Sequence, residues 1–211
     1  MYLDGTIRSY AEAASSGRPT PGGGSVAALA GALGMTMSCM AANFTVGKKK
    51  FKAVEPEARQ LLAACLRARD ELLRLMDEDT QAYAAVSAAC AMPKETPAQA
   101  AARTEMIQKA LVAAMDAPLQ VVRACRSAME PIARLAEIAN PNLISDVGVA
   151  TILAEAALRA AKLNVEINLQ GLEDPALSSA TRSEIVRAAE EARAIARQTM
   201  EKVVRAIGGT L

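Results

Sequence analysis

Apolar side chains recur every three or four residues along most of this sequence, which is the spacing of one face of an α-helix. Between residues 56 and 92, one such stripe contains Leu62, Leu66, Leu73, Met76 and Tyr83. The segments between the stripes show no strand pattern. The pattern predicts helices over residues 3–16, 25–45, 56–92, 96–130, 131–140, 145–170 and 181–206.

Helix-breaking and helix-capping residues set the boundaries of these elements. The pair Thr96–Pro97 is typical of a helix start, with a capping hydroxyl followed by proline at the first helical position. We expect Pro118 to kink the helix that contains it and Pro131 to begin a new, short helix. Ser145 is expected to cap the helix that ends at Gly171. The sequence therefore predicts six to eight helices joined by short connections.

One predicted helix is long and uncharged enough to need a membrane check. Val26 to Val46 contains no charged residue and is followed by a lysine run, which fits the length and flank of a transmembrane helix. Its residues, however, are mostly Ala, Gly, Ser, Thr, Met and Asn rather than Leu and Ile. Small residues at helical spacing let other helices approach closely. We therefore expect a central helix that is buried on all sides, and no membrane span.

The composition agrees with a helical fold. Of the 211 residues, 52% are hydrophobic and only 2% are aromatic, so Ala, Leu, Val, Ile and Met supply the apolar mass. Ala and Leu lead the scale of helix propensity. We predict an all-α protein, a single-domain antiparallel helical bundle over residues 1–211 with one long central buried helix.

Charge and cysteine usage bear on partners and location. The net charge is +1, so no bulk field favours nucleic acid or an anionic membrane as a partner. The polar, amphipathic N-terminal sequence does not resemble a signal peptide. Cys39, Cys65, Cys90 and Cys125 form no CxxC pair and lie in apolar helical segments. We expect reduced core thiols in a cytoplasmic protein.

The chain contains no histidine. This excludes the commonest general base, the Ser–His and Cys–His dyads, and zinc sites built on histidine. Acid–base chemistry must then come from Asp, Glu, Lys, Tyr, Cys or water. We expect no metal site.

Three features surround the uncharged helix. Gly22, Gly23, Gly24 and Ser25 lead into its N-terminus, where free N–H groups and the helix dipole favour an anionic or carbonyl-bearing ligand. An ordinary tight turn with Ser25 as the N-cap is the alternative. Asn43 is expected to be a buried amide that hydrogen-bonds either a ligand or another helix.

The basic run after this helix has two interpretations. Lys48, Lys49 and Lys50 can hold carboxylates of a ligand. Alternatively they are solvated lysines, favourably placed at the C-terminus of a helix.

The acidic stretch 77–79 contains one candidate catalytic group. Asp79 and Tyr83 are four residues apart and share a helix face that also carries Met76. A carboxyl group on an apolar face has a raised pKa and can exchange protons near neutral pH. A solvated acidic patch is the alternative for Asp79. It is the favoured interpretation of Asp77 and Glu78, because Asp77 points to a different face of the helix from Asp79.

Polar residues also gather around the predicted helix start at 145. Asp146 is either a favourable acid in the first turn or a site residue that stabilises a cation or positions water. Asn140 and Asn142 are either turn formers or amide-binding groups. Asn164 and Asn168 share a helix face and form either a polar pocket or a structural amide network.

Several of these residues belong to motifs that identify a family. The motifs are PTPGGGSVAALAGALG (19–34), AANFTVGKKKF (41–51), DEDTQAY (77–83), NPNLISDVGVA (140–150) and LNVEIN (163–168). In this order the chain resembles the C-terminal family of formiminotransferase-cyclodeaminase, over nearly its whole length. Ala139 departs from the family, which often has Gly at that position.

The resemblance implies one of two enzymes of tetrahydrofolate metabolism. A methenyltetrahydrofolate cyclohydrolase, the favoured reading, converts 5,10-methenyltetrahydrofolate and water into 10-formyltetrahydrofolate. A formimidoyltetrahydrofolate cyclodeaminase forms the methenyl compound with loss of ammonia. Both reactions pass through a tetrahedral carbon bonded to N5 and N10. A non-catalytic folate-binding or assembly protein is the hypothesis of another class.

The resemblance also implies roles and partners. Asp79 would be the general acid and base, and Asp146 the electrostatic or second proton-transfer group. It implies a homodimer that needs no cofactor beyond its tetrahydrofolate substrate. The substrate-binding residues would be Pro21, Gly22, Gly23, Gly24, Ser25, Asn43, Lys48, Lys49, Lys50, Tyr83, Asn140, Asn142 and Asn164.

Overall fold

The computed structural model describes residues 2–210, and within this range every regular element is a helix. This confirms the all-α prediction, and the six α-helices agree with the predicted number. The α-helices are α1 (Ile7–Ala14), α2 (Gly23–Asn43), α3 (Glu55–Cys90), α4 (Pro97–Ile138), α5 (Ile144–Gln170) and α6 (Pro175–Ala206). Short 3-10 helices cover Tyr2–Asp4, Lys49–Phe51 and Pro141–Leu143.

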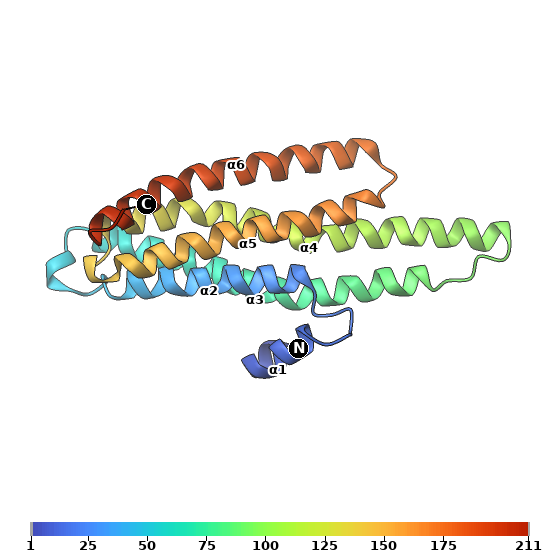
Figure 1. Ribbon diagram of the computed structural model, residues 1–211, viewed down its shortest axis with the longest axis horizontal. Helices are drawn as coiled ribbons and strands as arrows, with labels where there is room; N and C mark the ends of the chain where they lie inside the picture. The colour runs from blue at the N-terminus through green and yellow to red at the C-terminus, as the bar shows by residue number, and fades with distance from the viewer. Residues whose placement is uncertain (1, 211) are drawn as a thin grey trace.

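The five long helices lie along the long axis of the molecule (Figure 1). α2 packs on α3 and α5, α4 packs on the same two helices, and α6 lies against α4 and α5. The hairpin of α3 and α4 extends beyond the other helices at one end, and α1 lies apart, below the start of α2 (Figure 1). α2 and α5 are antiparallel, because Gly23 lies beside Asn164 whereas the Asn140 N–H donates to Thr45 Oγ1 at the other end.

The structure corrects the predicted division of α4. The helix begins as predicted, with a capping box in which Thr96 and Gln99 each accept the other's N–H, and Pro97 follows the cap. It then runs unbroken through both Pro118 and Pro131. A proline inside a helix removes one backbone hydrogen bond, and here Ile132 and Leu135, just beyond Pro131, are fully buried and continue the packed face. Tertiary packing therefore outweighs the local break.

Three helix starts also differ from the sequence prediction. Ser25 lies inside α2, whose N-cap is Gly22, and Ser145 lies inside α5, whose N-cap is Leu143. α6 begins at Pro175 rather than near residue 181, because the Asp174 side chain accepts the Leu177 N–H at 2.9 Å. Asp followed by Pro supplies both a cap and a preset first turn.

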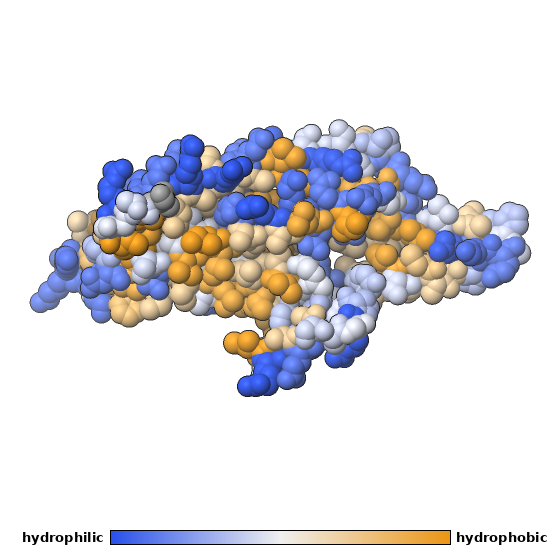
Figure 2. Space-filling view, in the orientation of Figure 1, coloured by the Kyte–Doolittle hydropathy of each residue, from blue (hydrophilic) through white to orange (hydrophobic). Residues whose placement is uncertain are grey.

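α2 is central but not buried on all sides as predicted. Toward α5 its packing is close, since a Cβ added to Gly34 would lie 3.2 Å from the Ala150 carbonyl oxygen. On the side of α2 that faces away from α3, α4 and α5, Val26, Leu33 and Met40 are 45%, 50% and 37% exposed, because no helix within residues 2–210 covers that side. Figure 2 shows this apolar surface on the face formed by α2 and α5.

By length and composition, α2 is also the one helix within residues 2–210 that could cross a membrane, and 61% of its apolar window is buried inside the bundle.

Three of the four thiols are core residues, as predicted. Cys39, Cys65 and Cys125 are buried, and burial raises the pKa of the Cys65 and Cys125 thiols to about 12. Such thiols are poor nucleophiles at neutral pH. Cys90 is exposed, contrary to the prediction, because it ends α3 in the projecting hairpin.

Candidate functional site

The N-terminus of α2 and the middle of α3 meet at Asp79. The backbone N–H of Ser25 donates to Asp79 Oδ2 at 2.9 Å. A Cβ added to Gly24 would lie only 2.1 Å from Asp79 Oδ1, so no residue with a side chain fits there while the carboxyl group stays in place. The glycine thus lets a carboxyl group sit against the positive end of a helix.

This environment sets the proton affinity of Asp79. Burial raises the pKa of its carboxyl group above the ordinary value, and the Ser25 N–H opposes the rise only in part. Within residues 2–210, Asp79 forms no ion pair with a cation. The predicted burial of the Asp79 carboxyl group is confirmed in part, since the side chain is half-buried and its pKa is raised, and its role in proton exchange stays a prediction.

Asn164 completes this cluster from α5. A Cβ added to Gly23 would lie 3.1 Å from Asn164 Oδ1, so the amide oxygen directly adjoins the loop. The Asn164 amide nitrogen donates to the carbonyl oxygen of Ala160 at 2.9 Å, which fixes the orientation of the amide. Pro21, which precedes the glycines, is buried after a cis peptide bond. We call the cluster of residues 21–25, Asp79 and Asn164 the glycine end.

The N-terminal segment covers the glycine end, which sequence reasoning missed. The Tyr10 hydroxyl lies 2.9 Å from Ser25 Oγ, and Ser25 is fully buried. Burial raises the pKa of Tyr10. The Tyr10 ring packs edge to face on the Tyr2 ring, with the two ring centroids 5.5 Å apart. Nothing in the local sequence of this short helix indicates that it packs on a segment 15 residues away.

Asp77 is also buried, and its interpretation as a solvated acid was wrong. It is 5% exposed, and its Oδ1 accepts the backbone N–H of Tyr2 at 2.9 Å. Its other oxygen has no hydrogen-bond partner among residues 2–210. The cover comes from a residue 75 positions earlier in the chain, so helical spacing alone could not reveal it. Tyr83, one turn beyond Asp79, is 46% exposed.

The remaining predicted residues lie at the other end of α2. Asn43 is the last residue of this helix and is exposed, which corrects its prediction as a buried amide. Lys48, Lys49 and Lys50 follow it and are exposed. We call the group formed by Asn43, the three lysines, Asn140, Asn142 and Asp146 the lysine end.

The loop before α5 is built as an asparagine turn. Asn140 Oδ1 accepts the Asn142 N–H at 3.1 Å, and the Asn140 N–H donates to Thr45 Oγ1 at 2.9 Å. Asp146 is half-buried in the first turn of α5. The two ends are separated by the length of α2, about 30 Å for its 21 residues. A single chain therefore does not bring all the predicted residues together. Asn168 is structural, since its amide donates to the Ala114 carbonyl oxygen at 3.1 Å.

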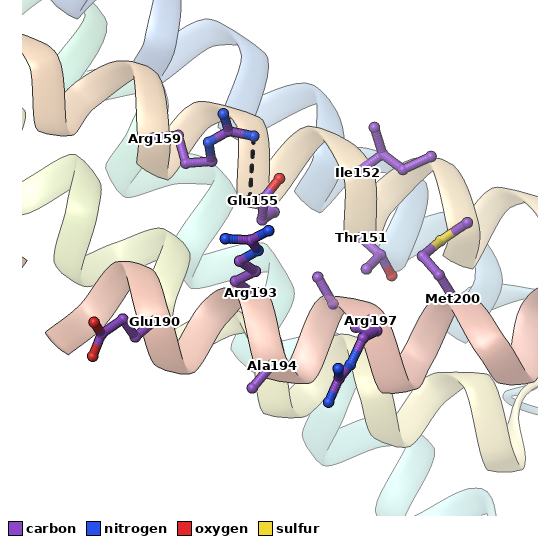
Figure 3. A pocket seen from close by; sticks show the side chains of 10 residues that line it. Thr151, Ile152, Glu155, Arg159, Glu190, Arg193, Ala194, Arg197 and Met200 are labelled. Carbon is purple, nitrogen blue, oxygen red and sulfur yellow. Dashed lines mark ion pairs between the residues drawn. The ribbon is translucent and has the colours of Figure 1, made fainter. Parts of the chain in front are cut away.

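A cavity of about 630 Å³ lies elsewhere, between α5 and α6 (Figure 3). It is lined by Thr151, Glu155, Arg159, Arg193 and Arg197 among others, and by none of the predicted site residues.

Comparison with known proteins decides the family. The family model described as formiminotransferase-cyclodeaminase matches residues 6–205. The chain belongs to this family. It is 39% identical to the methenyltetrahydrofolate cyclohydrolase of Methylorubrum extorquens, over 94% of this chain and 95% of that protein. It is 31% identical to the formimidoyltransferase-cyclodeaminase of Rattus norvegicus, over 90% of this chain but 35% of that protein.

A solved family member has the same fold. The crystal structure of formiminotetrahydrofolate cyclodeaminase from Thermotoga maritima matches with a TM-score of 0.80 and 29% identity, over 99% of this chain and 98% of that one. The glycine end and the lysine end thus belong to a bundle that the formiminotransferase-cyclodeaminase family shares.

The described part of this family member shows no candidate metal site. Among residues 2–210, no three His, Cys, Asp or Glu side chains lie close enough together to hold a metal ion. The absence of a cofactor other than the substrate remains a prediction.

Proposed function

We propose that this chain is a methenyltetrahydrofolate cyclohydrolase. The observation that carries the proposal is Asp79, a carboxyl group held by the Ser25 N–H at the glycine loop, with a pKa raised by burial. The Methylorubrum extorquens relative with that activity in its name matches over nearly the full length of both chains.

The reaction needs one group that takes a proton and returns it. The Asp79 carboxylate accepts a proton from water as the water oxygen bonds to the methenyl carbon, which gives a tetrahedral carbon bonded to N5 and N10. Protonated Asp79 then gives its proton to N5 as the carbon–N5 bond breaks. The new hydroxyl group loses its proton to solvent water as the formyl carbonyl forms on N10, so the reaction releases one proton overall. A raised carboxyl pKa suits both steps, because a group that titrates close to the working pH serves as base and as acid.

The other site residues bind and orient the substrate. We propose that Asn164 and N–H groups of the glycine loop bind the carbonyl and amide groups of the pterin. The lysines of the lysine end hold carboxylates of the glutamate tail. Asp146 lies about 30 Å from Asp79 within one chain, so its negative charge would stabilise the methenyl cation held at Asp79 of a second copy.

Cyclodeamination is the second candidate, because the Thermotoga maritima structure with that activity in its title matches over 98% of its length. In that reaction N10 attacks the formimino carbon on N5, and the proton of N10 passes to the imino nitrogen, which becomes an amino group. Asp79 would give a second proton to this nitrogen as its bond to carbon breaks, so that ammonia leaves and the 5,10-methenyl cation remains.

A paired assay separates these functions. One arm follows loss of the methenyltetrahydrofolate absorbance above the uncatalysed rate, and the other follows its appearance from formiminotetrahydrofolate with ammonia release. We expect activity in the first arm, the hydrolysis of methenyltetrahydrofolate. Replacing one general acid–base group typically costs about 100- to 10,000-fold, so Asp79→Asn should lower kcat by that factor. Asp70→Asn, at an exposed acid on the same helix, is the control. Folate binding without either reaction would mean a non-catalytic folate-binding protein.

The chain is further proposed to act in the cytoplasm as a homodimer, with no membrane or nucleic-acid partner. The uncovered apolar stripe of α2 supports the dimer, since monomers rarely leave large apolar patches in water. In sedimentation experiments, wild type should have the mass of two chains and the Leu33→Asp variant the mass of one chain. Cell fractionation should place the protein in the soluble extract.

A further inference from the structure

The first turn of α2 has no cap of its own. Its N-cap is Gly22, which has no side chain to accept an N–H, and Gly23 and Gly24 follow as the first two helical residues. Glycine weakens a helix, and the free N–H groups of a first turn need acceptors from elsewhere. The start of α2 therefore depends on other parts of the chain to hold it.

Ser25, the third residue of this helix, is held by two groups from outside α2. Its N–H donates to Asp79 Oδ2 at 2.9 Å, and its Oγ lies 2.9 Å from the Tyr10 hydroxyl. Ser25 is fully buried and Tyr10 is 8% exposed, so each hydroxyl depends on the other for its hydrogen bond. One residue thus connects the N-terminal segment, residues 2–16, to the proposed proton-transfer group.

Tyr10 is itself fixed by contacts that return to α3. Its ring packs edge to face on the Tyr2 ring, and the Tyr2 N–H donates to Asp77 Oδ1 at 2.9 Å. Asp77 lies two positions before Asp79 in the sequence. The contacts therefore form a closed circuit that begins and ends on α3, and this circuit sets the place of Tyr10 relative to Asp79.

The Tyr10 hydroxyl matters because little else attaches α1 to the bundle. Figure 1 shows α1 apart from the long helices, and Ile7 is 87% exposed. Only Tyr10 and Ala13 are buried within α1. An aromatic ring without a hydroxyl would still cover Ser25, but it would leave the buried Ser25 hydroxyl without its partner.

The pair of Tyr10 and Ser25 stays neutral while Asp79 titrates. Burial raises the pKa of Tyr10, the hydrogen bond to Ser25 opposes the rise, and Asp79, Tyr2 and Asp77 raise the pKa further. α2 itself contains no charged residue. The pKa of Asp79 has two causes, burial, which raises it, and the Ser25 N–H, which lowers it. A change at the Ser25 N–H therefore acts directly on the proton affinity of Asp79.

We propose that Tyr10 is a positioning residue for the proton-transfer group: its hydroxyl fixes the first turn of α2 through Ser25, and the fixed turn holds the Ser25 N–H on the Asp79 carboxyl group. Without the hydroxyl, Ser25 loses one of its two outside partners and its bond to Asp79 weakens. Because that bond lowers the pKa of Asp79, the pKa then rises further. The effect on catalysis rests on the proposed folate function, whereas the effect on the Asp79 carboxyl group does not.

Titration of Asp79 tests the inference without any substrate. Isotopic labelling of the aspartate carboxyl carbons gives each an NMR signal that moves as the group ionises, and the signal missing from Asp79→Asn belongs to Asp79. Tyr10→Phe should raise the midpoint of this signal by roughly half a pH unit, because a hydrogen bond that favours the carboxylate is weakened rather than lost. Tyr2→Phe, which keeps the ring and the N–H of Tyr2, is the matched control and should leave the midpoint unchanged. An unchanged or lowered midpoint in Tyr10→Phe overturns the inference.

A double variant separates the hydroxyl pair from a general loss of packing. Ser25→Ala removes the other hydroxyl of the pair and keeps the N–H, so it should raise the Asp79 midpoint as Tyr10→Phe does. The double variant Tyr10→Phe/Ser25→Ala leaves no buried hydroxyl without a partner, and it should shift the midpoint no further than either single change. Shifts that add would show two independent effects and overturn the pairing.

Hydrogen exchange measures the turn itself. Tyr10→Phe should speed exchange of the Ser25 N–H by at least about tenfold, because the first turn of α2 opens more often. The N–H of the fully buried Met35, in the middle of the same helix, should exchange as in wild type. Equal acceleration at both positions would mean a general loss of stability and would overturn the local role of Tyr10.

Kinetics tests the catalytic consequence. In Tyr10→Phe the acidic limb of kcat/KM against pH should move up together with the NMR midpoint, and kcat should fall less than in Asp79→Asn, since the carboxyl group is still present. If wild type catalyses neither folate reaction but the Asp79 midpoint moves, the proposed function fails and the positioning stands. If wild type is active and the midpoint does not move, the function stands and Tyr10 only covers the glycine end.

Discussion

At the scale of single residues, the chemistry depends on how Asp79 is held. Its carboxyl group is half-buried, accepts one backbone N–H and lies against a glycine that has no side chain to displace it. Burial disfavours the charged form and raises the pKa, which is why this carboxyl group can act as base and acid. The same burial makes the ionised group a cost to stability.

Asp79→Asn should therefore stabilise the folded protein at neutral pH. The folded pKa lies above the unfolded one, so the contribution of Asp79 is complete below the unfolded value and is lost as pH rises through the folded value. Asparagine keeps an acceptor for the Ser25 N–H and does not ionise. The melting temperature of the variant should exceed that of wild type by an amount that grows with pH. Each kcal/mol of added unfolding free energy corresponds to about 2–4 °C. Thermal unfolding at several pH values measures it, with Asp70→Asn as control; a difference that does not change with pH would contradict the argument.

Gly24→Ala should damage the site through a steric clash. The added Cβ would lie 2.1 Å from Asp79 Oδ1 and 2.6 Å from its Cγ, so the short side chain must move away from the Ser25 N–H. Overpacking of this kind costs about 1–3 kcal/mol of unfolding free energy. We expect that loss in urea titrations, together with a fall in kcat of at least about 100-fold, since the proton-transfer group is misplaced. Gly17→Ala, with no atom within 4 Å of its added Cβ, should change neither value.

At the scale of elements, α2 is positioned by close contact with α5. A Cβ on Gly34 would lie 3.2 Å from both the Ala150 carbonyl oxygen and Leu153 Cβ, so backbone and side chain of α5 limit the space. This contact sets the register in which Gly23 meets Asn164. Small residues at the crossing are therefore required by packing, although glycine itself weakens a helix.

Gly34→Ala should lower stability even though alanine is the better helix former. The gain in propensity is about 1 kcal/mol, whereas separating two packed helices costs about 1–3 kcal/mol. We expect a lower urea midpoint with an unchanged slope. Thr36→Ala, on a half-buried part of the same helix, supplies the comparison. A urea midpoint equal to or above that of wild type would show that α5 can move to accommodate the added methyl group without a loss of stability.

At the scale of the whole molecule, the proposed dimer depends on the apolar stripe of α2. Val26, Leu33 and Met40 are 45%, 50% and 37% exposed, and no helix within residues 2–210 covers them. Packing this stripe against a second copy would remove apolar surface from water, which stabilises the dimer.

Leu33→Asp should therefore separate the two copies. A carboxylate placed in an apolar interface is costly to bury, so the variant should have the mass of one chain where wild type has the mass of two. Sedimentation measures the mass of each protein. A variant that still sediments as a dimer would contradict the role of the α2 stripe.

Helix periodicity, composition and a set of ordered motifs sufficed to predict the helical bundle, the family and Asp79. These features are local, because the apolar stripe of a helix and the face that Asp79 shares with Met76 follow from positions a few residues apart. Boundaries that depended on packing were less predictable. α4 runs through Pro131 because its buried face continues beyond the proline.

Tertiary structure alone decided which of the predicted residues meet. The sequence could not show that Tyr2 buries Asp77 across 75 positions, or that Tyr10 covers Ser25. Nor could it show that Asn43 and Asn140 lie about 30 Å from Asp79, since their motifs are equally compatible with one pocket. Sequence spacing fixes which side chains share a helix face, whereas the direction in which helices pack fixes which ends come together.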